Sequence, residues 1–157
     1  MSAALVQNRT PAGGRSFMDA RGGCLCGAVR FTARDVHPEF HACQCRMCQR
    51  WGGGPAFAVE TGGMEFEEDG ALVRFAASDW AERGFCGRCG SNLFYFLVPA
   101  QQYMAWVGAF DDPTPFALAG EIFVDDPHAC FAFAGDHPRQ TGAEVVAAAG
   151  FTAPDDA

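Results

Sequence analysis

The chain has 157 residues, a formal net charge of −8 at pH 7 and a hydrophobic content of 49%. Such a length and composition are typical of one globular domain that is long enough to bury a core. All 11 cationic side chains are arginines, so the acidic balance argues against nucleic-acid binding, and the lack of lysine excludes Schiff-base catalysis.

The two ends of the chain are expected to lie outside the folded domain. The first residues, MSAALVQNRTPAGGRSF, have neither the cationic start nor the apolar stretch of a signal peptide. We predict a flexible leader over residues 1–19, a single β domain over 20–150 and a disordered tail over 151–157. Because no apolar run reaches the roughly 18 residues of a membrane span, we expect no membrane contact and a cytoplasmic location.

Most of the chain between these ends has the pattern of short β-strands. In chain order, the candidates are 28–33, 55–60, 71–77, 92–98, 103–110, 121–124 and 130–135. The segment MEFEED (64–69) also alternates apolar and polar residues, as half-buried strands do. Helical patterns are limited to one turn at 47–51 and to GAEVVAAAGF (142–151). We therefore predict a mainly β domain of mostly antiparallel sheets with little helix, whose loops carry the cysteines.

Seven of the eight cysteines fall into three tight clusters. The clusters have the spacings C-x-C, C-x-C-x2-C and C-x2-C, and their members are Cys24 and Cys26, then Cys43, Cys45 and Cys48, then Cys86 and Cys89. A C-x-C pair is too close in sequence to form a disulfide easily. In a reducing compartment, clustered cysteines bind metal more often than they form disulfides, so the pattern predicts zinc binding.

We expect the seven thiolates to divide as four plus three. Four thiolates make a closed structural zinc site, and we assign Cys24, Cys26, Cys86 and Cys89 to it. The triplet Cys43, Cys45 and Cys48 leaves one coordination position open, as catalytic zinc sites do. Two zinc ions per chain are therefore expected, with water or substrate at the open position of the second.

Other arrangements stay open on the sequence alone. Cys43 and Cys45 can complete the first site instead, and His41 can close the second site as a fourth ligand. Cys130 stands outside the clusters and is expected to be a free, buried, small hydrophobic residue. Candidates for offsetting the charge of the thiolate clusters are the arginines in or beside them: Arg46, Arg50 and Arg88.

Three segments carry the clustered cysteines: GGCLCGAVRF (22–31), CQCRMCQRWGG (43–53) and FCGRCGSNLFY (85–95). In this order they resemble the glutathione-dependent formaldehyde-activating enzyme family, which also includes centromere protein V. The segments VGAFDDP (107–113) and EIFVDD (121–126) look like the C-terminal half of the same family.

The resemblance implies a beta-tent-like fold of several coiled antiparallel sheets built around zinc-binding loops, with the same four-plus-three division of the cysteines. It also implies a carbon–sulfur lyase that joins glutathione, or another small thiol, to formaldehyde or a related small aldehyde. Zinc lowers the pKa of a bound thiol, which is the chemistry that such an addition needs. Many relatives carry a His at the position of Glu121 and a Trp near Cys130 or Phe131, so the substrate pocket is expected to differ here.

Two non-enzymatic hypotheses are kept beside the enzyme. In the first, the chain is a zinc-stabilised binding module whose triplet is closed by a further protein ligand and never meets a substrate. In the second, it is a thiol redox or metal-buffering protein whose triplet exchanges between disulfide and zinc-bound states. Access of a small thiol to the second metal distinguishes the enzyme from the binding module.

Overall fold

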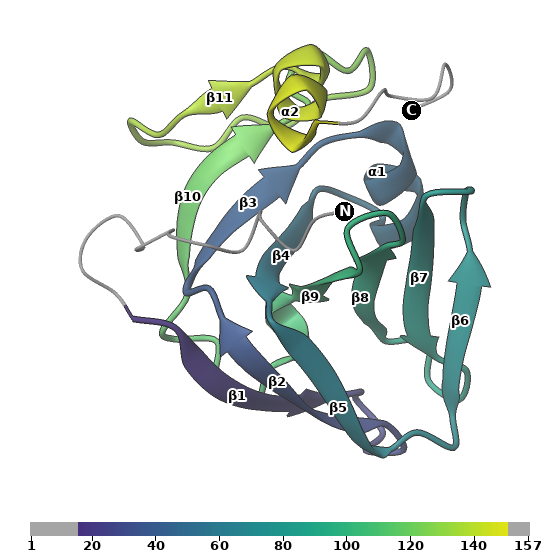
Figure 1. The fold of residues 1–157 in the computed structure, drawn as a ribbon. Helices are drawn as coiled ribbons and strands as arrows, with labels where there is room; N and C mark the ends of the chain where they lie inside the picture. The colour runs from purple at the N-terminus through teal and green to yellow at the C-terminus, as the bar shows by residue number, and fades with distance from the viewer. Residues whose placement is uncertain (1–15, 151–157) are drawn as a thin grey trace.

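The computed structural model describes residues 16–150, which form two β-sheets and two short α-helices (Figure 1). The smaller sheet has the strand order β1-β2-β5, with β1 at Met18–Gly23, β2 at Arg30–Val36 and β5 at Gly63–Glu68. The larger sheet has eight strands in the order β11-β10-β3-β4-β9-β8-β7-β6. These are β3 (Glu39–Cys43), β4 (Ala56–Thr61), β6 (Leu72–Ala76), β7 (Ala81–Cys86), β8 (Asn92–Leu97), β9 (Gln102–Trp106), β10 (Ala117–Ile122) and β11 (Arg139–Gln140).

The predicted class, mainly β with little helix, is confirmed. Strands β2, β4, β5, β6, β8 and β9 each overlap a segment that the sequence pattern predicts, and a 3₁₀ turn (Val107–Ala109) follows β9. Strand β10 begins before the predicted segment 121–124. Strands β1, β3 and β7 were not predicted, because glycine and charged residues, which are depleted in strands, interrupt their apolar patterns.

The strand expected at 130–135 is wrong, because these residues lie in the loop between β10 and β11. Phe133 packs as a single side chain against Phe57, with 5.6 Å between ring centroids, instead of joining a sheet. Cys130 lies in the same loop and is exposed, so the expectation that it is buried is also wrong. Alternating apolar residues signal a half-buried strand only where a partner strand is available.

Strand pairing is mostly antiparallel, as predicted, but one edge of the larger sheet is parallel. β10 runs parallel to both β3 and β11, whereas the other paired strands are antiparallel. The parallel pairing sets Ile122 beside Cys43 and Glu121 beside Ala42. It thereby brings the end of β10 to the first cysteine of the triplet.

The main core lies between the two sheets. Phe31 of β2 and Phe94 of β8 are fully buried there, and Phe66 of β5 packs against both rings, with centroid distances of 6.2 Å and 5.7 Å. Along β7, successive side chains point to opposite faces of the larger sheet. Gly84 faces Phe94 and the core, so Arg83 points to the other face.

The two helices begin and end with recognisable caps. In α1 (Arg46–Gly52), the Cys45 side chain accepts a hydrogen bond from the Cys48 N–H, and Gly53 ends the helix with a φ of 77°. In α2 (Gly142–Ala149), Thr141 and Glu144 form a capping box. Both helical predictions are therefore confirmed, within a residue or two at their ends.

Within residues 16–150, no helix is long and apolar enough to cross a membrane. Strand β1 begins at Met18, inside the range that the sequence assigns to the leader. The rest of that leader up to residue 15, and the expected tail at 151–157, lie outside the described residues.

Candidate metal centres

The first cysteine group joins two turns that are far apart in the sequence. Cys24 and Cys26 follow β1, while Cys86 ends β7 and Cys89 lies in the turn before β8. Their four sulfur atoms lie within 4.8 Å of one another. A tight turn makes this possible, since Gly90 adopts a φ of 76° and its N–H donates to the Cys86 carbonyl at 2.8 Å.

The sulfur spacings of this group fit a tetrahedral metal. Four sulfurs at about 2.3 Å from a zinc ion lie about 3.8 Å from one another. The observed separations are 3.6 Å between Cys24 Sγ and Cys26 Sγ and 3.8 Å between Cys26 Sγ and Cys86 Sγ. Cys24 and Cys86 are buried, and Cys26 and Cys89 lie at the surface. The group can therefore hold a metal ion between the ends of the two turns.

Hydrogen bonds favour the thiolate form of two members of the four-cysteine group, Cys24 and Cys89, whereas the pKa of Cys26 is raised to about 11. The Val29 N–H donates to Cys24 Sγ at 3.2 Å, and the Ser91 hydroxyl lies 3.2 Å from Cys89 Sγ. Hydrogen bonds from Ser91 lower the pKa of the Cys89 thiol to about 5. Metal ligation requires deprotonated thiols, so these contacts prepare the group for a cation.

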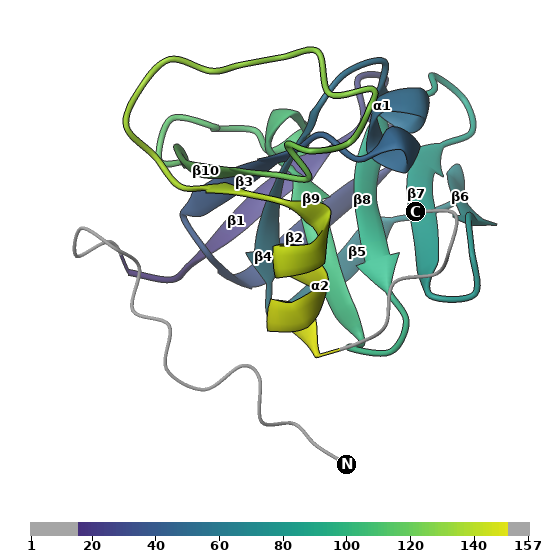
Figure 2. The same cartoon turned by 90° about the horizontal axis from the view of Figure 1, so that it is seen from above.

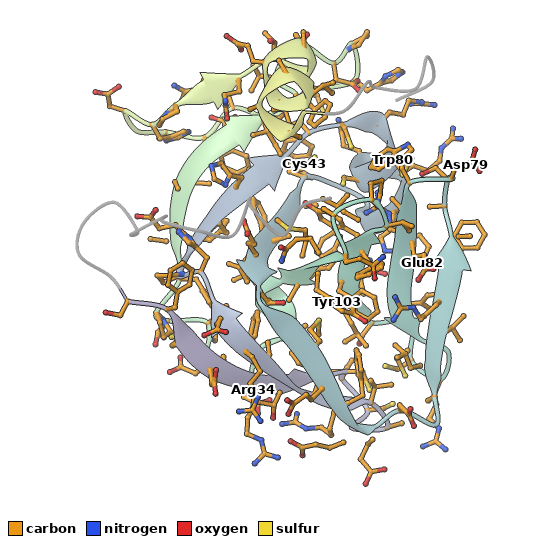
Figure 3. The ribbon with its side chains drawn as sticks, in the orientation of Figure 1. Arg34, Cys43, Asp79, Trp80, Glu82 and Tyr103 are labelled. Atoms are coloured by element: carbon orange, nitrogen blue, oxygen red, sulfur yellow. The ribbon has the colours of Figure 1, made fainter. Side chains whose placement is uncertain are left out.

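The second group is buried and lies where β3 meets α1. Cys43 ends β3, Cys45 is the N-cap of α1, and Cys48 lies in its first turn. The three sulfurs lie within 4.8 Å of one another, and the residues are only 5%, 8% and 3% exposed. Figure 3 shows Cys43 at the α1 end of the molecule, away from Arg34 on the three-stranded sheet. The cap geometry fixes Cys45 and Cys48 on one side of the helix start.

Among residues 16–150, the triplet has no fourth metal-ligating side chain within the same distance. His41 is exposed on β3, with its ring beside Gly120 of β10, and it does not join the three sulfurs. Cys43 and Cys45 also stay apart from the four-cysteine group. The structure thus separates the seven thiols as four plus three and brings neither of the alternative ligand sets together.

A buried arginine, which sequence reasoning missed, lies against the triplet. Arg83 of β7 is 2% exposed; its Nη2 lies 3.8 Å from Cys48 Sγ and its guanidinium carbon 5.0 Å from the Tyr95 ring centroid. Hydrogen bonds from the Cys43 and Cys48 thiols lower the pKa of the Cys45 thiol, and the Arg83 charge contributes in the same direction. By contrast, the arginines expected to offset charge at the clusters are all exposed: Arg46, Arg50 and Arg88.

Glu121 is not a ligand of either group but part of a buried polar network behind the triplet. Its carboxylate is 1% exposed and accepts hydrogen bonds from Gln44 Nε2 at 2.8 Å and Arg139 Nε at 3.0 Å. His137 Nε2 lies 2.7 Å from the same carboxylate. Gln44 stands between Cys43 and Cys45, so the network fixes the backbone of the triplet from β10 and β11.

The loop between β10 and β11 passes beside α1 (Figure 2) and is hydrogen-bonded to it. Asp126 accepts a hydrogen bond from the Arg46 N–H at 3.0 Å, and Gln49 Nε2 donates to the His128 carbonyl at 2.9 Å. Phe123, at the start of the loop, packs against the buried cysteines. The loop thus contributes to the burial of the triplet, and the motif spacing gave no sign of it.

Comparisons with known proteins agree with this arrangement. The sequence profile of the family described as glutathione-dependent formaldehyde-activating enzyme matches residues 19–126. An uncharacterized lyase of Schizosaccharomyces pombe is 28% identical over 127 residues, which are 80% of this chain and 93% of that protein. A putative glutathione-dependent formaldehyde-activating enzyme of Halomonas elongata is 34% identical over 88 residues, or 48% of this chain and 54% of that one.

A solved structure shows the same fold. The crystal structure of a Rhodobacter sphaeroides protein matches with a TM-score of 0.50 and 21% identity, over 58% of this chain and 87% of that one. The matched profile covers all seven clustered cysteines, and the two groups they form in space are those expected from the motifs. The chain belongs to the glutathione-dependent formaldehyde-activating enzyme family.

Proposed function

We propose that the chain is a zinc-dependent carbon–sulfur lyase that joins a small thiol, with glutathione as the lead candidate, to formaldehyde or a related small aldehyde. The observation that carries this proposal is the buried triplet, which offers three sulfurs and no fourth side-chain ligand among the described residues. Three protein ligands and an open position are typical of catalytic zinc. In this proposal, Cys24, Cys26, Cys86 and Cys89 hold a structural zinc.

A zinc ion at the triplet would supply an open coordination position and would stabilise the thiolate form of a small thiol at neutral pH. The residues around it have separate tasks. Cys43, Cys45 and Cys48 bind the ion, the Arg83 charge lies beside them, and the loop after β10 limits the access of water. No protein nucleophile takes part, in keeping with a chain without lysine.

The reaction itself is an addition in which atoms and charge balance. The thiol sulfur forms a bond to the carbonyl carbon, and the π electrons of the C=O bond move to its oxygen. The proton that the thiol loses is transferred to this oxygen. The product is a hemithioacetal, which for formaldehyde is the S-hydroxymethyl adduct of the thiol. Holding thiol and aldehyde together at one buried place supplies the proximity contribution to the rate.

The test has two steps. Metal content by mass spectrometry, on protein purified without chelator, is expected to give about two zinc ions per chain. NMR exchange spectroscopy with ¹³C-formaldehyde then measures the interconversion of glutathione and its adduct, which also occurs without enzyme. We expect the wild type to accelerate this exchange, Cys45→Ser to abolish the acceleration, and Cys130→Ser, a matched control at an exposed cysteine outside both groups, to retain it.

Each alternative gives a different result. About two zinc ions per chain, with no acceleration and no response of the second metal to added thiol, support the binding module, whose closed triplet never meets a substrate. Loss of zinc on mild oxidation, reversed by reductant, supports the redox or metal-buffering protein. Equal exchange rates for wild type, Cys45→Ser and buffer contradict the enzyme outright.

A further inference from the structure

The arginines of the larger and smaller sheets are partnered in two different ways. Five of them form ion pairs with carboxylates at 2.5 to 3.0 Å: Arg21, Arg30, Arg34, Arg74 and Arg139. Arg83 is the most deeply buried, at 2% exposure, yet no carboxylate of residues 16–150 forms an ion pair with it. Its Nε is buried and has no hydrogen-bond partner in the described part of the chain.

A buried cation without a counter-ion is strongly destabilising, because desolvation of the charge is not offset. The candidate anion in contact with Arg83 is the cysteine triplet, since Nη2 lies 3.8 Å from Cys48 Sγ. The guanidinium carbon of Arg83 also lies over the ring of Tyr95, which is its cross-strand neighbour on β8. Arg83 is thus held between the Tyr95 ring and the triplet, with one guanidinium nitrogen near Cys48 Sγ.

The charge of a metal-loaded triplet matches this arrangement. Three thiolates around one divalent cation keep one net negative charge, which one arginine neutralises. A fourth, anionic ligand then binds to a centre whose total charge, with the arginine included, is zero. Without the arginine, the same ligand would add a second negative charge to a buried cluster, which low local polarity disfavours.

We propose that Arg83 is the counter-ion of the triplet centre and the residue that allows the centre to accept an anionic thiolate as its fourth ligand. It acts through the centre and is therefore a positioning residue. This inference rests on the proposed function, because it takes the triplet to hold a divalent metal with an open position. It adds the chemical class of the fourth ligand, which is a small anion.

Cobalt(II) replaces zinc in thiolate sites, and its sulfur-to-metal charge-transfer absorption follows the number of thiolates bound. We would titrate the cobalt-loaded wild type, Arg83→Gln and Arg83→Lys with glutathione and follow this absorption. The wild type is expected to bind saturably, Arg83→Gln to bind at least about tenfold more weakly, and Arg83→Lys to recover part of the loss, because it restores the charge but not the planar group over Tyr95.

A matched control is Arg74→Gln on the neighbouring strand β6. Arg74 also packs over aromatic rings, but it pairs with Glu82, and its cross-strand neighbour Gly84 places it on the other face of the sheet from Arg83. We expect Arg74→Gln to bind glutathione as the wild type does. The absorption of the closed four-thiolate cobalt centre reports whether each variant is folded.

The outcomes separate the inference from the proposed function. Equal affinities of wild type and Arg83→Gln overturn the inference and leave the open site intact. A wild type whose absorption does not respond to glutathione overturns the open site itself and the inference with it. If Arg83→Gln does not fold, the wild type is titrated with azide and with imidazole instead. A preference for the azide anion supports the role of Arg83, and a preference for neutral imidazole contradicts it.

Discussion

The strongest consequence of the two-group arrangement is that equivalent substitutions in the two groups have unequal effects. Cys86→Ser is expected to unfold the protein, whereas Cys45→Ser is expected to leave the fold intact. Cys86 is fully buried in the main core at the end of β7 and ties this strand to the turn after β1. Cys45 lies on the opposite face of the larger sheet, outside that core.

The magnitudes follow from the role of each group. A structural zinc contributes about 10–16 kcal/mol of apparent binding free energy in small zinc domains. A whole domain has a net stability of about 5–15 kcal/mol. Loss of the zinc from the closed group would therefore remove an amount comparable to the entire free energy of unfolding, and loss of one thiolate weakens the binding of this ion. In Cys45→Ser the closed group is intact, and serine, a favoured N-cap residue, can accept the Cys48 N–H bond that starts α1.

The assay is thermal unfolding by circular dichroism combined with zinc content. For Cys45→Ser we expect a destabilisation of about 1 kcal/mol, which corresponds to a shift of about 2–4 °C at this chain length, and one zinc per chain. For Cys86→Ser we expect aggregation or an unfolded spectrum. If Cys86→Ser melts within a few degrees of the wild type, or if both variants are equally destabilised, the division into structural and open groups is wrong.

Two further predictions concern the surroundings of the groups. Gly84→Ala is expected to destabilise the protein by about 1–3 kcal/mol in urea unfolding, because its Cβ would overlap the Phe94 ring, whereas Gly63→Ala, whose Cβ meets nothing within 4 Å, is the tolerated control. Burial raises the pKa of Glu121, but the hydrogen bond to His137 and the charge of Arg139 lower it by more, so the pKa is below its usual value. The stabilisation that the ionised Glu121 provides is therefore present above the ordinary pKa of about 4.3 and is lost as pH falls through the lowered value. The wild type is expected to lose more stability in acid than Glu121→Gln. Equal pH profiles of unfolding for the two proteins would contradict this.

The substitution at Glu121 also shows how a departure from the family pattern is accommodated. The sequence indicates only that an acidic residue stands where many relatives have His. In the structure, the carboxylate satisfies Gln44, His137 and Arg139 in a buried network beside the triplet. Glu121 therefore supports the cysteine loop and is not part of either cysteine group, and the difference in the substrate pocket stays a prediction.

The sequence by itself indicated the candidate ligands and the fold class. Cysteines two or three residues apart are held close by their own turns, so the spacings alone predict C-x-C and C-x2-C ligand pairs. Short alternating runs between Gly, Pro and Asp likewise indicated a mainly β domain, and the segment GAEVVAAAGF (142–151) indicated α2. These signals depend on residues close together in the sequence, so they can be interpreted without knowledge of the tertiary structure.

Only the tertiary structure decided what surrounds the triplet. Arg83 is 35 residues from Cys48, and Glu121 is 77 residues from Gln44. Their contacts depend on sheet order, on the parallel pairing of β10 with β3 and on which face of β7 points to the triplet. A one-residue change of register would send Arg83 to the opposite face, and no property of the segment AERGFC (81–86) alone fixes that register. Long-range packing therefore places Arg83, the proposed counter-ion, and Glu121 beside the triplet.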